Sequence, residues 1–133
     1  MAYDEQTLLS TLSAPAASDM TVKQFFAVSL ASDGAGAVSA ALATQNKACT
    51  GILKNNPYTG VVAEIQTEGI TKAAITASTA ITAGQLLKVD TGGTLCVKDA
   101  SNTVVAQALE SLSSVAAVAI IAVRLLPSNA ALA

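Results

Sequence analysis

Short runs of strand-forming residues alternate with clusters of turn-forming residues along most of this 133-residue chain. The turn clusters are rich in glycine, proline, asparagine and aspartate and recur roughly every eight to twelve residues. Residues 49–69 show the pattern most clearly: Ile52 and Leu53 precede a polar turn, and alternation of apolar and polar residues resumes at Val61. This spacing predicts an all-β fold, a small β-barrel or β-sandwich, rather than an α/β arrangement.

The other strands follow from the same alternation of apolar runs and turns. Beyond residues 49–69, we expect strands at 23–30, 70–77, 86–89, 94–98, 104–109 and 116–126. Residues 37–44 are open between a helix, which their alanines favour, and a strand, which their position favours. The last run has alanines that suit a helix, but its valines and isoleucines favour a strand. Because that run is continuously apolar, we expect both of its faces to be covered.

The N-terminal residues differ in composition, so we divide the chain into an extended arm at 1–22 and a single β-barrel domain at 23–133. Three leucines of the arm could form one side of a short helix begun at Asp4: Leu8, Leu9 and Leu12. Pro15, among small and polar residues, would end such a helix. We expect the arm to pack against another subunit or another protein, the alternative being an arm folded back on its own domain.

The composition limits the class of protein. In the full chain 52% of residues are apolar, 3% aromatic and 12% charged, so we expect a partner to cover part of the surface. A net charge of −2 with 7 scattered basic residues leaves no basic stripe for nucleic acid. Residues 115–126 are too few to cross a bilayer, and the acidic N-terminus is unlike a signal peptide. We expect a soluble protein, made in a reducing cytoplasm, that binds neither nucleic acid nor membrane.

The residue inventory predicts that the chain is not an enzyme and holds no metal or cofactor. The chain has no histidine, so neither a zinc site nor a Cys-His pair can be built on Cys49 and Cys96. We interpret both cysteines as small apolar residues on strands, with a disulfide between them left open. Gly34 and Gly36 imitate part of a dinucleotide-binding loop, but the third glycine and the following βα repeat are missing.

The order of turns and strands over residues 48–127 resembles the small capsid decoration (cement) proteins of tailed bacteriophages. In that family a G-x-L-x-N-x-P-x-x-G-like turn precedes an A-x-V-x-x-x-G strand, and a T-A-G turn leads into an L-x-x-D-x-x-G hairpin. An A-L-E strand and a last apolar strand ending in R-L-L follow. The matching positions are Gly51, Leu53, Asn55, Pro57 and Gly60; Ala63, Ile65 and Gly69; Thr82, Ala83 and Gly84; Leu87, Asp90 and Gly93; Ala108, Leu109 and Glu110; and Arg124, Leu125 and Leu126. Residues 111–119 depart from the pattern, since relatives often have a glycine-aspartate turn there, which leaves the start of the last strand open.

The resemblance implies a compact β-barrel of the type called a β-tulip. It also implies a homotrimer that sits on the outer surface of the capsid, over three-fold and quasi-three-fold positions. There such a trimer clamps neighbouring subunits of the major capsid protein. The implied role is that of a structural protein of the virion.

Two segments are the candidate contact regions. In the arm, the apolar side chains that gain most from being covered are Tyr3, Leu8, Leu9 and Leu12. The second segment is the turn that contains Asn55, Pro57 and Tyr58, which we expect at one end of the barrel near an inter-subunit contact. The alternative function is a head-fibre or adhesin module that binds a host-surface glycan, with Tyr58 as the best-placed aromatic residue. A small hydrolase is a third class, which the residue inventory opposes.

Overall fold

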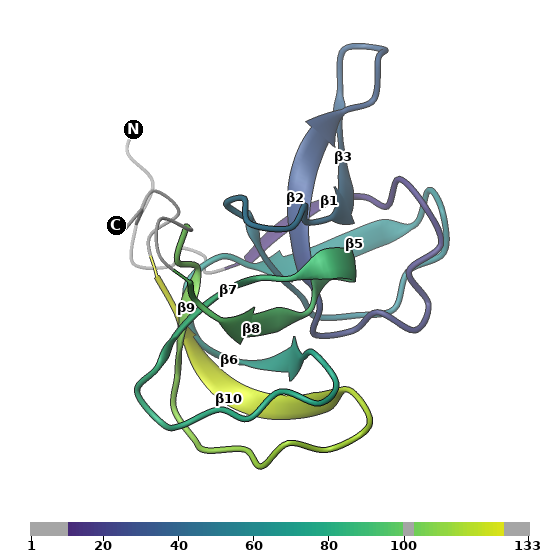
Figure 1. The fold of residues 1–133 in the computed structure, drawn as a ribbon. Helices are drawn as coiled ribbons and strands as arrows, with labels where there is room; N and C mark the ends of the chain where they lie inside the picture. Colours follow the sequence, from purple (N-terminus) through teal and green to yellow (C-terminus); the bar gives the residue numbers. More distant parts are fainter. Residues whose placement is uncertain (1–10, 100–102, 127–133) are drawn as a thin grey trace.

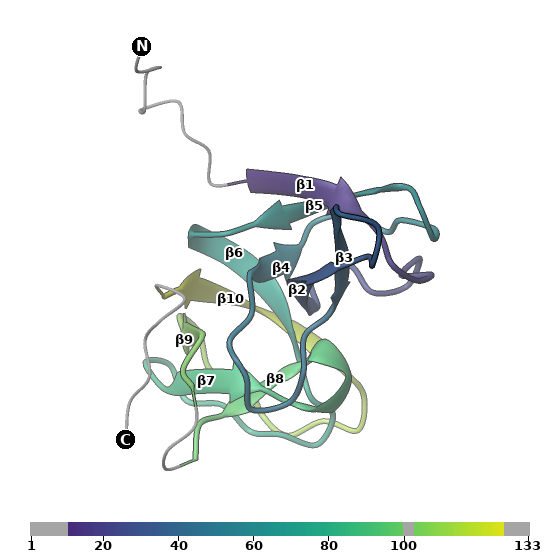
Figure 2. The ribbon, with the colours of Figure 1, turned by 90° about the horizontal axis from the view of Figure 1, so that it is seen from above.

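The computed structural model describes residues 11–99 and 103–126, and this part of the chain forms ten strands. The strands are β1 (Thr11–Pro15), β2 (Ala27–Ser32), β3 (Val38–Leu42), β4 (Gly51–Leu53), β5 (Val62–Gln66), β6 (Gly69–Ile75), β7 (Leu86–Val89), β8 (Leu95–Val97), β9 (Ala106–Ala108) and β10 (Ala119–Leu125). A 3₁₀ turn, η2 (Thr91–Gly93), separates β7 from β8. Figures 1 and 2 show two layers, a five-stranded sheet and a closed five-stranded barrel. The predicted class, an all-β fold with a small barrel, is confirmed.

The first layer, which we call the N-terminal sheet, is antiparallel in the order β1-β5-β4-β2-β3. The sheet curls until its outer strands meet: Ala16 forms a parallel bridge with Ala40, and the Ala17 amide donates to the Ala40 carbonyl at 2.7 Å. In Figure 1 the β2–β3 hairpin projects beyond the rest of this sheet. The curled sheet encloses a small core of Ala14, Ala16, Met20, Val28, Ala40, Leu53, Ala63 and Ile65.

The second layer is a closed barrel in the order β10-β6-β8-β7-β9. All of its pairings are antiparallel except that of β6 with β8, which is parallel at Ile75 and Leu95. Alternate residues of β10 point into the barrel, where they meet apolar side chains of β6, β7 and β8. Closure leaves the barrel without an unpaired strand edge.

The two layers join at Phe25, just before β2. The Phe25 amide donates to the Leu53 carbonyl of the N-terminal sheet at 2.7 Å, and its carbonyl accepts from the Ala74 amide of the barrel at 2.9 Å. Phe25 reaches both partners with a left-handed backbone, φ 74°. Ala27 and Ile52 of the N-terminal sheet are fully buried in the barrel's hydrophobic cluster. The N-terminal sheet therefore contributes side chains to the core of the barrel in addition to enclosing its own small core.

Several predicted strands are confirmed, whereas the prediction that both faces of the last strand are covered is wrong. Residues 49–69 form strand, turn and strand, and the open segment 37–44 forms β3. The last strand begins at Ala119, after an irregular segment that includes the bridge between Ile81 and Leu112. We expected both faces of this strand to be covered, but only its inner residues are buried within the chain. The outer residue Ile120 is 42% exposed, although Ala74, its partner across the β6–β10 pair, is fully buried.

The predicted arm is also partly wrong. Residues 11–15 are strand β1, not the end of a helix, and pair with β5 over its whole length. Met20 is fully buried, and its amide donates to the Pro57 carbonyl at 2.9 Å. Residues 11–20 therefore fold back on their own domain, which was the alternative interpretation. The arm as a separate element stays a prediction for residues 1–10, which lie outside the described residues.

The burial of Met20 predicts that this segment stabilises the domain. Met20→Ala should lower the free energy of unfolding by about 2–5 kcal/mol, because it leaves a cavity in a small core. The neighbouring Val22 is 79% exposed, so Val22→Ala should change it by no more than about 0.5 kcal/mol. Urea unfolding followed by circular dichroism measures both. Equal effects of the two substitutions would mean that the segment is a detachable arm after all.

Candidate interaction surface

In the turn between β4 and β5, two of the three predicted contact residues, Asn55 and Pro57, stabilise the turn itself. The Asn55 amide group donates to the Val62 carbonyl, and its oxygen accepts from the Glu64 amide, each at 3.0 Å. Pro57 is buried. Tyr58 is 67% exposed, so it is the one residue of the predicted trio whose side chain is free to meet a partner.

The other predicted contact residues are not brought together with this turn in the described structure. Tyr3, Leu8 and Leu9 lie outside the described residues. Leu12 lies on β1 opposite Ile65, at the rim of the N-terminal sheet's core, and is 37% exposed. The assignment of a contact surface to the arm therefore stays a prediction for its first ten residues.

An exposed face that the sequence did not reveal covers the outside of β6 and β10 and extends to Leu109, the residue after β9. We call it the β10 face, and its members are Ile70, Lys72, Leu109, Ile120 and Arg124. Ile70 is 67% exposed, and Leu109 and Ile120 are each 42% exposed. The period-two alternation of residues 119–125 could have revealed this face, because it places Ile120 and Arg124 on the same side of the strand. The alternation of inward and outward residues was not evident, because nearly every residue of 119–125 is apolar.

A second exposed face lies on the outside of β1 and β5. We call it the β5 face, and its members are Ser13, Pro15, Val62 and Glu64. Ser13 lies opposite Glu64 and Pro15 opposite Val62 in the antiparallel register. Val62 is 51% exposed, so this face combines apolar side chains with a carboxylate.

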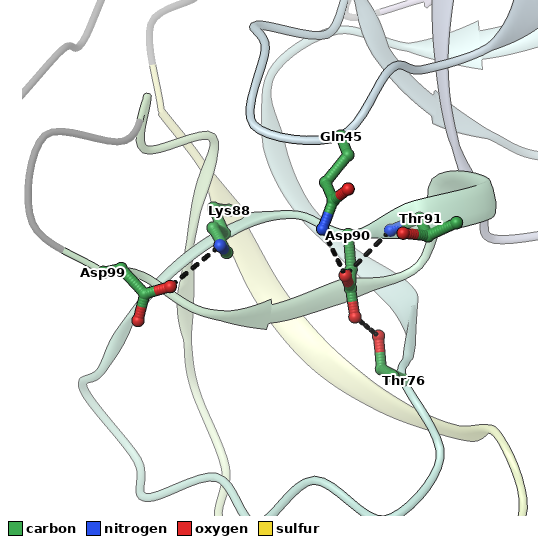
Figure 3. A network of polar contacts seen from close by, with 6 residues as sticks. All are labelled: Gln45, Thr76, Lys88, Asp90, Thr91 and Asp99. Carbon is green, nitrogen blue, oxygen red and sulfur yellow. Dashed lines mark hydrogen bonds and ion pairs between the residues drawn. The ribbon is translucent and has the colours of Figure 1, made fainter.

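A polar cluster around Asp90 fastens the loop after β3 to the barrel (Figure 3). The Asp90 carboxylate accepts from the Thr76 hydroxyl at 2.7 Å, the Thr91 amide at 2.8 Å and the Gln45 amide group at 3.2 Å. Burial opposes ionisation of Asp90, but the bonds from Thr76 and Thr91 and the Lys88 charge outweigh it and lower the pKa below 3.8. Asp90 therefore stays ionised at neutral pH and acts as a structural acceptor.

Lys88 and Cys96 lie opposite each other on β7 and β8, next to this cluster. The Lys88 ammonium donates to the Asp99 carboxylate at 2.9 Å, and this bond raises the pKa of Lys88 although burial opposes the shift. Burial and then the negative charge of Asp90 raise the pKa of the Cys96 thiol to about 11. A thiol with so high a pKa is a poor nucleophile at neutral pH.

The Cys49 thiol has a raised pKa like that of Cys96. Burial raises the pKa of the Cys49 thiol to about 11, and both cysteines are free thiols. Among residues 11–99 and 103–126, no group of three or more cysteine, aspartate or glutamate side chains is arranged to hold a metal ion. The same part of the chain contains no helix of the length and hydropathy needed to span a membrane.

The fold defines a small all-β protein in which a curled sheet is packed on a closed barrel. Comparison of the sequence with protein-family models and with curated proteins finds no match. Comparison with solved structures finds the head fiber gp8.5 N base of bacteriophage phi29, with a TM-score of 0.66. The two chains are 18% identical, and the match covers 90% of this chain and 95% of that chain. At this identity the likeness establishes a shared fold.

The lowered pKa of Asp90 predicts a pH-dependent contribution to stability. The contribution is present above the pKa of the unfolded carboxyl and is lost as pH falls through the lower, folded value. Asp90→Asn should lower the free energy of unfolding by about 1 kcal/mol at pH 7, since the half-exposed carboxylate is screened by water. In urea titrations the difference from the parent chain should shrink towards pH 2. A difference that stays constant over this range would contradict the assignment.

The raised thiol pKa values predict slow alkylation of the folded protein. Because a rise from 9.0 to about 11 depletes the thiolate, iodoacetamide should react with both cysteines about 100-fold more slowly at pH 8 than after unfolding in urea. The folded-state rate should rise about tenfold per pH unit until the pH approaches the pKa. Mass spectrometry of the two cysteine peptides separates the sites. Similar rates in the folded and unfolded chains would show that the thiols are not protected.

Proposed function

We propose that this chain is a structural component of the head of a tailed bacteriophage and attaches to the outer surface of the shell. The observation that carries the proposal is the fold it shares with a phage head fiber base over 90% of its length. A fold alone does not define a function. The order of turns over residues 48–127 supports the same class independently of the structural match.

The surface of the described residues supports a role in binding other subunits. The β10 face and the β5 face expose branched apolar side chains on the outer sides of the barrel and of the N-terminal sheet. Interface cores are depleted in charged residues, and only 12% of this chain is charged. Several such contacts made at once by an oligomer gain avidity without any single contact being strong.

In the first form of the proposal the chain is a decoration protein. As a homotrimer it links adjacent subunits of the major capsid protein and raises the barrier to their separation under the pressure of packaged DNA. This form rests on the resemblance to the cement family. Nothing in it requires a bound cofactor or a catalytic residue.

In the second form the chain is the base of a head fibre. The observation that favours it is the solved structure itself, which is the base of a head fiber. In this form the chain links the shell to a more distal element, and a host-surface glycan is a candidate ligand. Tyr58, 67% exposed at the tip of a braced turn, offers the aromatic surface on which a sugar ring could stack.

The two forms differ in what binding does to the head. Purified chain should co-sediment with phage heads assembled without it in either form. If it is a decoration protein, bound heads should resist heat disruption more than bare heads, by several degrees in a light-scattering melt. If it is a fibre base, the disruption temperature should not change. A chain that stays monomeric and also fails to sediment with heads would contradict both forms.

The glycan-binding version of the second form has its own test on an array. Tyr58→Ala should abolish a signal seen with the parent chain, whereas Tyr58→Phe should retain most of it, because stacking depends on the ring and not on the hydroxyl. Val22→Ala, at another exposed apolar position, is the matched control. A signal that survives Tyr58→Ala would exclude Tyr58 as the binding residue.

A further inference from the structure

The β10 face combines cations with apolar side chains. Across the β6–β10 pair, Arg124 lies opposite Ile70 and Lys72 lies opposite Ala122. The Arg124 guanidinium donates to the Gln107 side chain of β9 at 3.2 Å, which holds it along the sheet. Within the described residues neither Lys72 nor Arg124 pairs with a carboxylate. Both charges therefore remain available to a partner.

The β5 face carries the opposite charge. Glu64 stands between Val62 and the end of β5, with Ser13 and Pro15 on the neighbouring strand. Lys54 is next to Glu64, but its ammonium donates to the Thr71 hydroxyl at 2.9 Å, so it does not neutralise the carboxylate directly. The β5 face therefore offers an acidic and apolar surface to a partner.

We propose that the β10 face of one copy of this chain binds the β5 face of the next. Two copies of the β10 face would bring like charges together, which disfavours a two-fold contact through that face. A β10 face against a β5 face pairs Lys72 and Arg124 with Glu64 and covers apolar side chains on both sides. Such a head-to-tail contact uses two different surfaces and closes into a ring when the rotation between copies permits it.

This inference extends the proposed function, since it assigns surfaces to the contact that a homotrimer would use. The self-contact can fail while attachment to heads survives, so the two are measured separately. The assembly state is measured on the isolated chain by analytical ultracentrifugation, and attachment to heads is measured by co-sedimentation.

Charge reversal on each face tests the contact. One variant carries Lys72→Glu with Arg124→Glu, and the other carries Glu64→Lys. Each should weaken self-association at least about tenfold, because like charges then meet in the contact. A third variant with all three substitutions should recover it, because the charges are again opposite. In an equimolar mixture the first two variants should associate in pairs, although neither does so alone; a ring of three would retain one repulsive contact.

Lys47→Glu, at an exposed position on the loop after β3, is the charge control and should leave self-association unchanged. Circular dichroism confirms that every variant is folded, and the mixture provides the rescue even if the triple variant does not fold. A wild-type chain that sediments as a monomer would overturn the proposal. So would single-face variants that associate normally, or a loss that neither the triple variant nor the mixture restores.

Discussion

The backbone of Phe25 is the connection on which the two-layer arrangement depends. Its amide donates to a carbonyl of one layer and its carbonyl accepts from an amide of the other, and the residue makes both bonds with a left-handed φ. A bulky residue in this region costs roughly 1–3 kcal/mol, so the surrounding packing must hold it in place. Ala27 and Ile52 supply that packing by entering the barrel's core directly after this junction. The strain is thus offset by the shared core.

The cores of both layers consist almost entirely of aliphatic side chains. The largest fully buried side chains are Met, Ile, Leu and Val, and the aromatic residues Phe25 and Phe26 are only partly buried. Aliphatic side chains bury less area per residue than aromatic ones, so each buried residue stabilises its layer less than an aromatic residue would. Sharing side chains across the junction compensates for this. We therefore expect the sheet and the barrel to unfold as one cooperative unit.

The sequence predicted what depends on local chemistry and missed what depends on distant partners. Turn residues and period-two alternation identified most strands, because turn geometry is set within a few residues. Strand β1 was missed because its residues, TLSAP, have little strand propensity, and pairing with β5 stabilises it. Asn55 and Pro57 were identified as exceptional, but their role is to build a turn braced by Met20, which sequence spacing does not reveal. The β10 face could not be predicted, because the exposure of a strand face depends on how the layers pack against each other.

The bridge between Ala16 and Ala40 has a consequence for how copies of this chain can be crowded together. Strand edges left open tend to add further strands, which leads to open-ended growth. Here the barrel is closed and the curled sheet meets itself at this one bridge, which reduces the backbone that is offered for that kind of addition. Copies held at high local density would therefore meet through the side chains on the outer sides of the two layers. Contacts of that kind have a defined size and can separate again without any strand leaving its sheet.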